Sequence, residues 1–404
     1  MIAVHDAEQI LLAHLGNFGE TTVPLSAALG RILAEPLIAD RDFPPFHRVA
    51  MDGFAVAFDA IREGRMRFEV SHAQMAGAPE SALSNPALAV EVMTGAVLPV
   101  GANVVIRLED VEIQSNGTQK IIEVKAMPES EWQHIHLKGF DRKQGETIVQ
   151  LGTRITPAEI AVAASIGKST LRVYQIPRIA VVSTGDELVP IDQTPLPHQI
   201  RQSNAYTLQA FLAKMKIESD MFHLHDSRDE METVLARLLN EYDVILTTGS
   251  VSAGGVDILP SVLTKLSVRK LIHKIEQRPG KPMWFGRKGW KFVFALPGNP
   301  VSIVVCFLKY VRMWLLRSMG VKPEMQLYAS LESDIIFKPQ LTYFLPVKLF
   351  SKRNGTLEAQ PIKGHGSGDF ANLVDCDGFL ELPPEKTIFY SDEPYPVILY
   401  REIR

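Results

Sequence analysis

Residues 291–302 read KFVFALPGNPVS, and this stretch decides the fold that the sequence predicts. An apolar run passes into a short loop of proline, glycine and asparagine, and an apolar helical pattern follows. The same order occurs twice earlier, in IAVVSTGDE (179–187) and in VILTTGSVS (244–252). Helices are expected between these strands, near 204–216 and 228–240. Continuous apolar strands that alternate with helices predict a parallel sheet covered by helices on both faces.

The regions on either side of this α/β segment have different sequence patterns. From about 43 to 132 the chain consists of short β runs separated by turn residues, which predicts a small β domain. Helical patterns are expected before it, at 6–18 and 25–32, and after it, at 157–166. The β domain is therefore interpreted as an insertion into a helical domain. Beyond residue 323 short β runs occur again, and they predict a separate C-terminal barrel or sandwich.

Size and composition limit the classes of protein that need to be considered. The 404 residues exceed what one core usually organises, and 46% hydrophobic with 22% charged residues is typical of a packed globular chain. The net charge of −4 gives no reason to expect nucleic acid. The longest apolar stretch, 301–308, is far too short to span a membrane, and no signal-peptide pattern occurs, so a cytoplasmic location is expected. Cys306 and Cys376 have no metal-ligand spacing, and Cys306 is interpreted as a core residue.

The loops that follow the predicted parallel strands are the candidate ligand site. Ligands of open parallel sheets bind beyond the carboxyl ends of the strands, where glycine-rich turns and helix N-termini direct backbone N–H groups toward an anion. In the 247–257 loop, Gly249, Ser250 and Ser252 suit an oxyanion, although glycine is also common in ordinary turns. Asp257 precedes a predicted helix at 258–266, where it is either an N-cap or a magnesium ligand beside a phosphate.

Two further loops add charge and a hydroxyl group. RPGKP (278–282) holds Arg278 and Lys281 among rigidifying residues, which suits an anion held in fixed geometry; a solvated surface turn is the alternative. The 296–302 loop contains Pro297 and Pro300, and Ser302 falls in the first turn of the following helix. The Ser302 hydroxyl is expected either near an anion or simply at a helix start.

In the β insertion, MDGF (51–54) and MTGA (93–96) place Asp52 and Thr94 at turns. Turn formation alone would account for both residue types. The histidine pairs 134/136 and 223/225 alternate as strand residues do and are interpreted as structural. No Ser/His/Asp or Cys/His arrangement emerges from the sequence, so covalent catalysis is not expected.

Taken together, six motifs in order resemble the molybdopterin molybdenumtransferase family, which comprises the MoeA proteins and the E domain of gephyrin. They are FPPFHRVAMDGFAV (43–56), MTGAVLP (93–99), STGDEL (183–188), the 248–257 loop, PGKP (279–282) and LPGNPVS (296–302). The resemblance covers essentially the whole chain, and motifs found in their predicted structural context are specific.

The resemblance implies four domains: a discontinuous helical domain (1–42 and 136–176), the β-rich insertion (43–135), a molybdopterin-binding α/β three-layer domain (177–322) and a C-terminal β-barrel (323–404). It implies a homodimer whose site lies between the α/β and C-terminal domains of one subunit and the insertion of the other. The reaction it implies is insertion of molybdate into adenylylated molybdopterin with release of AMP, assisted by Mg²⁺. A molybdopterin adenylyltransferase and apo-molybdoenzymes are the protein partners expected.

Residue roles follow from the motif matches. The catalytic positions implied are Asp52, Thr94, Asp257 and Lys281, with Asp257 also the Mg²⁺ ligand. Substrate-binding positions are Glu187, Asp226, Gly249, Ser250, Ser252, Arg278, Pro297, Pro300, Ser302 and, from the serine loop at 365–368, Ser367. Asp141 matches a further functional position more loosely.

The chain also departs from the family pattern. Arg278 stands where lysine is common, Val49 replaces a frequent serine, and Gly249-Ser250 replaces a frequent glycine pair. An arginine that many relatives carry in the C-terminal domain is missing near 343–346, and Lys348 or Lys363 is expected to substitute for it.

Two rival functions are weighed against molybdenum insertion. Adenylylation of molybdopterin needs only an α/β domain and would leave the Asp52 and Thr94 turns and the barrel unused. A gephyrin-like dimeric scaffold, or a protein that only binds molybdopterin, would leave Asp52, Asp257 and Lys281 without a task.

Overall fold

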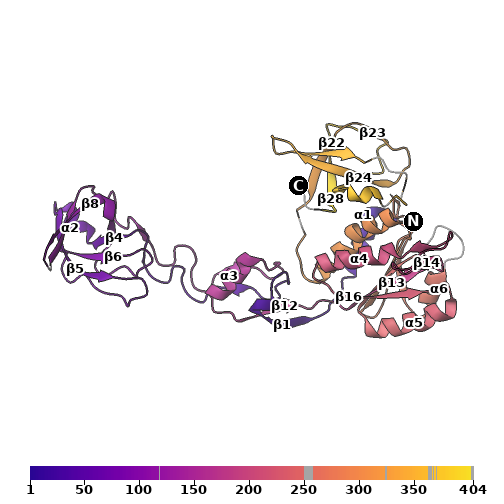
Figure 1. The fold of residues 1–404 in the computed structure, drawn as a ribbon, viewed down its shortest axis with the longest axis horizontal. Coiled ribbons are helices and arrows are strands. Elements are labelled where there is room, and N and C mark those ends of the chain that lie inside the picture. The colour runs from indigo at the N-terminus through magenta and orange to yellow at the C-terminus, as the bar shows by residue number, and fades with distance from the viewer. Residues whose placement is uncertain are drawn as a thin grey trace. The chain divides into compact units, whose positions relative to one another are not determined.

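A computed structural model of the chain describes residues 1–117, 119–249, 258–323, 325–362, 366, 368–369 and 371–401. The chain forms two compact units (Figure 1). The first unit comprises Met1–Glu35, Leu151–Thr156 and Thr170–Arg404, and the second comprises Pro36–Gln150 and Pro157–Ser169.

The first unit contains a six-stranded sheet in the order β16-β13-β17-β21-β20-β18. Three of its parallel strands were predicted from the sequence: β13 (Ile179–Thr184), β17 (Val244–Thr248) and β21 (Lys291–Leu296). A fourth, β16 (Ser219–Leu224), pairs with β13 and was not predicted. The sequence did not predict the two antiparallel strands at one edge, β20 (Trp284–Lys288) and β18 (Arg269–His273). A two-residue turn joins β20 to β21, and such a turn allows only antiparallel pairing.

Helices cover both faces of this sheet, because alternate strand residues point to opposite sides. On one face, Ile179 and Val181 pack in a core with the helices α1, α4, α7 and α8, whereas Ala180 and Val182 pack on the other face with α5 and α6. In Figure 1, α4 lies on one side of β13 and α5 and α6 on the other. The helices are α1 (Val4–Ala13), α4 (Ser203–Lys214), α5 (Arg228–Glu241), α6 (Ile258–Lys265), α7 (Pro300–Cys306) and α8 (Met313–Ser318), and a π-helix, η3 (Phe307–Arg312), joins the last two.

The C-terminal part of this unit is a closed five-stranded barrel, which confirms the barrel prediction. Its strands pair in the circular order β24-β25-β22-β28-β26 and back to β24. Closure leaves no free edge in the ring. The strands are β22 (Leu327–Leu331), β24 (Thr342–Ser351), β25 (Leu357–Pro361), β26 (Gly378–Leu382) and β28 (Pro394–Leu399), with a pair β23 (Ile335–Ile336) and β27 (Ile388–Phe389) beside them and a 3-10 turn η4 (Ala371–Val374).

The remaining elements of the first unit are short strands. Strand β1 (Glu20–Pro24) pairs with β12 (Thr170–Tyr174), and β14 (Leu188–Val189) pairs with β15 (Ile200–Arg201). The helix predicted at 25–32 is wrong. Only a single 3-10 turn, η1 (Leu25–Ala27), forms there, because Gly30 has a φ of +83° and Ile32 pairs with Arg154 instead.

The second unit is built on a six-stranded sheet in the order β7-β4-β6-β5-β9-β8, with apolar clusters on both faces. Its strands are β4 (Gly53–Val56), β5 (Arg67–Gln74), β6 (Leu88–Val92), β7 (Val104–Arg107), β8 (Val111–Asn116) and β9 (Gln119–Val124). The β runs predicted between 43 and 132 are thereby confirmed. The unit also contains α2 (Phe58–Arg62), η2 (Leu108–Asp110), the predicted helix α3 (Pro157–Ser165), and the pairs β2 (Leu37–Ile38) with β11 (Thr147–Val149) and β3 (Arg48–Val49) with β10 (Ile135–His136).

Within the described part of the chain, none of the helices combines the length and the apolar character that crossing a membrane would require.

Candidate functional site

The loops at the carboxyl ends of β13, β17 and β21 come together in the first unit. The Thr184 hydroxyl at the end of β13 donates a hydrogen bond to the Thr248 carbonyl at the end of β17, at 3.2 Å. A Cβ atom placed on Gly298, just beyond β21, would lie 3.8 Å from the Cα of Gly249. The structure therefore brings three of the sequence-predicted loops to one edge of the sheet, where ligands of open parallel sheets bind.

Gly249 is required at the centre of this edge. Its φ is +96°, and a Cβ atom there would lie 2.4 Å from the Thr184 carbonyl oxygen. Any other residue would be strained and would push the β13 and β17 ends apart. The predicted residues Ser250, Ser252 and Asp257 belong to the same loop but lie outside the described residues.

The residues that follow β13 and β16 add acidic groups and a histidine to this edge. The Asp186 carboxylate accepts a hydrogen bond from the Asp226 backbone N–H at 3.1 Å and lies 3.2 Å from Nδ1 of His225. The two substrate-binding candidates in this region, Glu187 and Asp226, are both exposed. From the sequence, Asp186 was assigned no role and His225 was interpreted as structural. The connection depends on β13 and β16 being neighbours, which residue spacing alone does not show.

The loop with the two predicted cations joins the α/β sheet to the barrel. Arg278 belongs to β19 (Gln277–Arg278), which pairs in parallel with the barrel strand β24. The Arg278 guanidinium lies 5.9 Å from the ring centroid of Phe337, and Phe337 stacks on Tyr343 at 4.3 Å. Burial raises the pKa of Tyr343, and the positive charge of Arg278 opposes that shift. Arg278 and Lys281 are both exposed, so their charges are available to an anion.

The loop before α7 lies against α4. The Asn204 side-chain amide donates to the Gly298 carbonyl at 2.7 Å, so the start of α4 holds this loop. Pro297 is buried and Pro300 is half-buried at the first position of α7, where proline is favoured. Ser302 is 3% exposed, and its carbonyl oxygen lies 3.6 Å from the position of a Cβ atom on Gly280. The helix α7 and the cationic loop are therefore in contact.

In the second unit, Asp52 and Thr94 lie side by side. One Asp52 oxygen accepts a hydrogen bond from the Thr94 backbone N–H at 2.6 Å and another from the Thr94 hydroxyl at 2.7 Å. The backbone bond, and then the hydroxyl bond, lower the pKa of Asp52 below its usual value. Both residues are exposed, and Asp52 is an ionised carboxylate at neutral pH.

The other candidates in the second unit and the barrel are less connected. Asp141 is exposed, and its backbone N–H donates to the Phe43 carbonyl at 2.9 Å. Lys348 Nζ lies 5.8 Å from the ring centroid of Phe350, two residues along β24. Lys363 and Ser367 lie outside the described residues.

Metal binding and covalent catalysis would each require a cluster of suitable side chains within the described residues. In these segments no group of three or more His, Cys, Asp or Glu side chains could hold a metal ion. The Ser183 hydroxyl oxygen lies 3.2 Å from Nδ1 of His223. Ser183 is only 1% exposed, however, and its hydroxyl donates a hydrogen bond to the Phe222 carbonyl at 3.2 Å. Because the Ser183 hydroxyl is buried and already donates a hydrogen bond, we interpret this pair as structural and not as a nucleophile with its base.

Three family models match successive parts of the chain. The MoeA N-terminal region (domain I and II) matches residues 2–167, a probable molybdopterin binding domain matches 180–317, and the MoeA C-terminal region (domain IV) matches 328–399. Over 399 residues the chain is 39% identical to a molybdopterin molybdenumtransferase of Synechocystis sp., covering 98% of this chain and 99% of that protein.

The chain belongs to the molybdopterin molybdenumtransferase (MoeA) family.

Further MoeA relatives agree with this assignment. The molybdopterin molybdenumtransferase of Bacillus subtilis is 30% identical over 403 residues, which cover 97% of this chain and 92% of that protein. The crystal structure of a molybdopterin biosynthesis MoeA protein from Pyrococcus horikoshii OT3 superposes with a TM-score of 0.83 at 28% identity, covering 99% of this chain and 100% of that one. The MoeA family and its multidomain fold, both predicted from the sequence, are confirmed.

Proposed function

We propose that the chain inserts molybdenum from molybdate into the dithiolene of molybdopterin, taking the adenylylated form and releasing AMP. The observation that carries this proposal is the 39% identity to a molybdopterin molybdenumtransferase over almost the whole of both chains. The convergence of the three strand-end loops, with two exposed cations nearby in the same unit, supports it independently.

The chemistry asks for positioning and charge rather than for a protein nucleophile. The two thiol sulfurs of the dithiolene bond to molybdenum, and an oxygen displaced from molybdate leaves as water with the two thiol protons. Release of AMP consumes one water and leaves the terminal phosphate on the pterin. Molybdate is a dianion that must approach a phosphate-bearing ligand, so Arg278 and Lys281 would offset the repulsion. Ser302 and the Gly249 loop would orient oxygen atoms, with Ser250, Ser252, Pro297 and Pro300 completing the lining.

The acidic residues are assigned a different part of the reaction. Asp52 is held ionised by Thr94, so it would act as a base or hydrogen-bond acceptor for the substrate and not as an acid. Glu187 and Asp226 would accept hydrogen bonds from the pterin or the nucleotide. Asp141 and Ser367 are proposed as further contacts on the family pattern alone.

Magnesium belongs to the proposal only as an assisting ion. Mg²⁺ prefers a few carboxylates together with phosphate oxygens, and Asp257 is its candidate ligand from the sequence. The described residues do not supply a three-ligand group. The steps proposed for the protein's own residues are independent of the ion.

The wider organisation is also proposed. It comprises the four domains (1–42 with 136–176, 43–135, 177–322 and 323–404), a homodimer in which the insertion of one subunit completes the site of the other, and a cytoplasmic location. Both cysteines are buried free thiols, as expected in a reducing compartment. A molybdopterin adenylyltransferase would supply the substrate, and apo-molybdoenzymes would receive the product.

Molybdate-dependent release of AMP tests the function directly. The purified chain is mixed with adenylylated molybdopterin, Mg²⁺ and molybdate, and the nucleotide is followed by chromatography. Release that requires molybdate and is lost in Asp52→Ala is expected. Release that is no faster than in a protein-free control, with folded protein and bound substrate, would remove the insertion proposal.

A further inference from the structure

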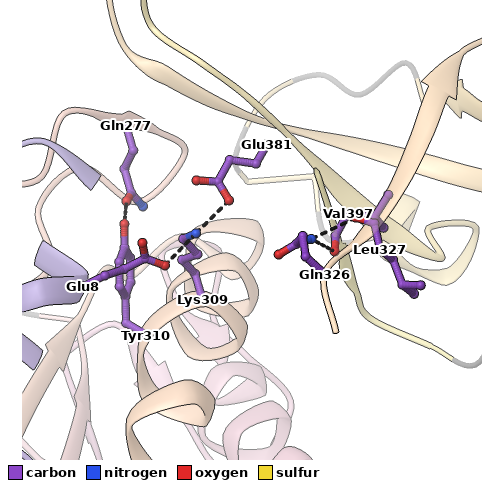
Figure 2. A network of polar contacts seen from close by, with 8 residues as sticks. All are labelled: Glu8, Gln277, Lys309, Tyr310, Gln326, Leu327, Glu381 and Val397. Atoms are coloured by element: carbon purple, nitrogen blue, oxygen red, sulfur yellow. Dashed lines mark hydrogen bonds and ion pairs between the residues drawn. The ribbon is translucent and has the colours of Figure 1, made fainter. Parts of the chain in front are cut away.

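Gln277, the residue directly before Arg278, is buried and fully hydrogen-bonded. It is 1% exposed. Its side-chain oxygen accepts a hydrogen bond from the Tyr310 hydroxyl, as Figure 2 shows. Its side-chain nitrogen donates to the Pro279 carbonyl at 2.9 Å and lies 3.7 Å from the sulfur of Cys306. The amide therefore links helix residues of the core to the backbone of the cationic loop.

Three consecutive carbonyl groups of the loop, those of residues 279–281, accept hydrogen bonds from other groups of the protein. Pro279 O accepts from the Gln277 amide, and Gly280 O accepts from the Cys306 thiol at 3.6 Å and from the Met283 N–H at 3.3 Å. Lys281 O accepts from the Ile275 N–H at 2.9 Å. Since carbonyl oxygens carry partial negative charge, turning them inward leaves the loop's outer surface to its two cationic side chains.

The support for this arrangement is rigid. Tyr310 is fully buried in the π-helix η3, and π-helical turns often occur at functional sites. Its neighbour Lys309 lies 2.7 Å from a carboxylate oxygen of Glu8 on α1 and 2.7 Å from one of Glu381 on β26 (Figure 2). The π-helix is thus tied to α1 and to the barrel through Lys309, the residue next to Tyr310.

The loop also fits tightly against its support. A Cβ atom on Gly280, whose φ is +91°, would lie 2.6 Å from the Cys306 sulfur and 2.6 Å from the Gln277 nitrogen. Both neighbours are buried and cannot move aside. The loop is therefore pressed onto the amide and the thiol, and a displacement of either would be transmitted to Arg278 and Lys281.

We propose that Gln277 is a positioning residue for anion binding: anchored by Tyr310 and assisted by Cys306, it sets the direction in which Arg278 and Lys281 present their charges to molybdate. This inference rests on the proposed function, since it concerns the affinity of that same site. It assigns a role to three buried residues that the sequence motifs leave out.

Tyr310→Phe and Gln277→Met test the proposal, with AMP release measured against molybdate concentration. Tyr310→Phe removes one hydroxyl and leaves the Gln277 oxygen without its anchor. The KM for molybdate is expected to rise roughly tenfold, as for loss of one buried hydrogen bond, with kcat changed much less. Combining both substitutions should raise KM no further than Gln277→Met alone, because the two residues act in one chain of contacts.

Tyr395→Phe is the matched control. Tyr395 is 4% exposed in the barrel, and its hydroxyl donates to Glu393 at 2.6 Å, away from the loop. It should lose comparable stability in thermal melts and keep the wild-type KM. If Tyr310→Phe and Gln277→Met are folded and active with an unchanged KM for molybdate, or if Tyr395→Phe raises KM equally, the positioning role is wrong. An inactive wild-type chain would instead refute the proposed function.

Discussion

The cationic loop around Lys281 and the acidic turn around Asp52 both hold exposed charged side chains in place, but they do so with different contacts. The loop holds two exposed cations by fastening its backbone to the buried side chains of Gln277 and Cys306, and Gln277 is anchored in turn by Tyr310 of η3. The turn holds an exposed carboxylate with two hydrogen bonds from a single neighbour, Thr94. The first arrangement depends on a chain of buried residues in the core, whereas the second involves only two exposed residues. Substitutions near the loop should therefore act at a distance, whereas those near the turn should act locally.

The largest effect is expected for Lys281→Ala. Removal of one charge that stabilises a developing or approaching anion typically costs about 100-fold in rate, and the loop backbone is held by other residues. The molybdate-dependent rate of AMP release should therefore fall about 100-fold while the melting temperature stays near that of the wild type. Lys281→Arg, which keeps the charge with a different shape, should retain part of the rate. Equal losses in both variants would show that shape rather than charge is decisive.

Lys309→Met tests the support beneath the loop. Lys309 has a side chain only 12% exposed between two carboxylates, and removing it leaves Glu8 and Glu381 facing each other without a partner. Breaking a buried ion pair in this way costs about 3–5 kcal/mol, measurable by denaturant unfolding. The control is Lys265→Met, because Lys265 pairs with Glu232 at 2.6 Å with its side chain 63% exposed. That change should cost no more than about 1 kcal/mol, and similar losses in both variants would contradict the structural role of Lys309.

Alkylation of the cysteines tests the packing behind the cationic loop. Burial raises the pKa of Cys376 to about 11, and it raises the pKa of Cys306 further. Because the thiolate is the reactive form, neither cysteine should react with iodoacetamide at pH 8 in the native protein, and both should react after unfolding. Mass spectrometry of the labelled chain measures this. Rapid labelling of Cys306 in the folded protein would mean that the loop does not pack as described.

The smallest effect is expected in the acidic turn. Thr94→Val removes the hydroxyl donor and keeps the backbone donor, so the pKa of Asp52 should rise but remain below the usual aspartate value. The pKa is lower in the folded chain than in the unfolded chain. The linked stability is therefore complete above about pH 3.9 and is lost as the pH falls through the folded-state value. A titration of the Asp52 carboxyl carbon by NMR measures the shift. Thr94→Ser keeps both donors and should leave the titration unchanged.

Local sequence pattern predicted the strands and loops of the site, whereas contacts between distant residues could not be predicted. Strands β13, β17 and β21 are apolar runs that end in glycine-containing loops, so local pattern was sufficient to place Gly249 and the Pro297 loop at one edge. The Asp52 and Thr94 turns were found through motifs, although the hydrogen bonds between them, 42 residues apart, could not be predicted from spacing.

The support beneath the cationic loop lay beyond sequence reasoning for a physical reason. Gln277 and Tyr310 are 33 residues apart and meet only after η3 has packed against the loop. A glutamine in a strand is ordinarily expected to face solvent, so its burial becomes visible only in the fold. The helix prediction at 25–32 failed in the opposite way, because there the local pattern indicated a structure that a distant contact replaced. A locally plausible helix gave way to pairing of Ile32 with Arg154, a contact made by a distant segment.

The helix α1 has a consequence for the order in which the chain can fold during synthesis. Val4, Ala7 and Leu11 belong to the core that α7, η3 and α8 complete, and Glu8 binds Lys309. These partners leave the ribosome about 300 residues after α1, a delay of roughly 15–60 s at typical elongation rates. An amphipathic segment that emerges so long before its partners must therefore wait exposed until they have been made. Its apolar face is a natural place for a chaperone to bind during that interval.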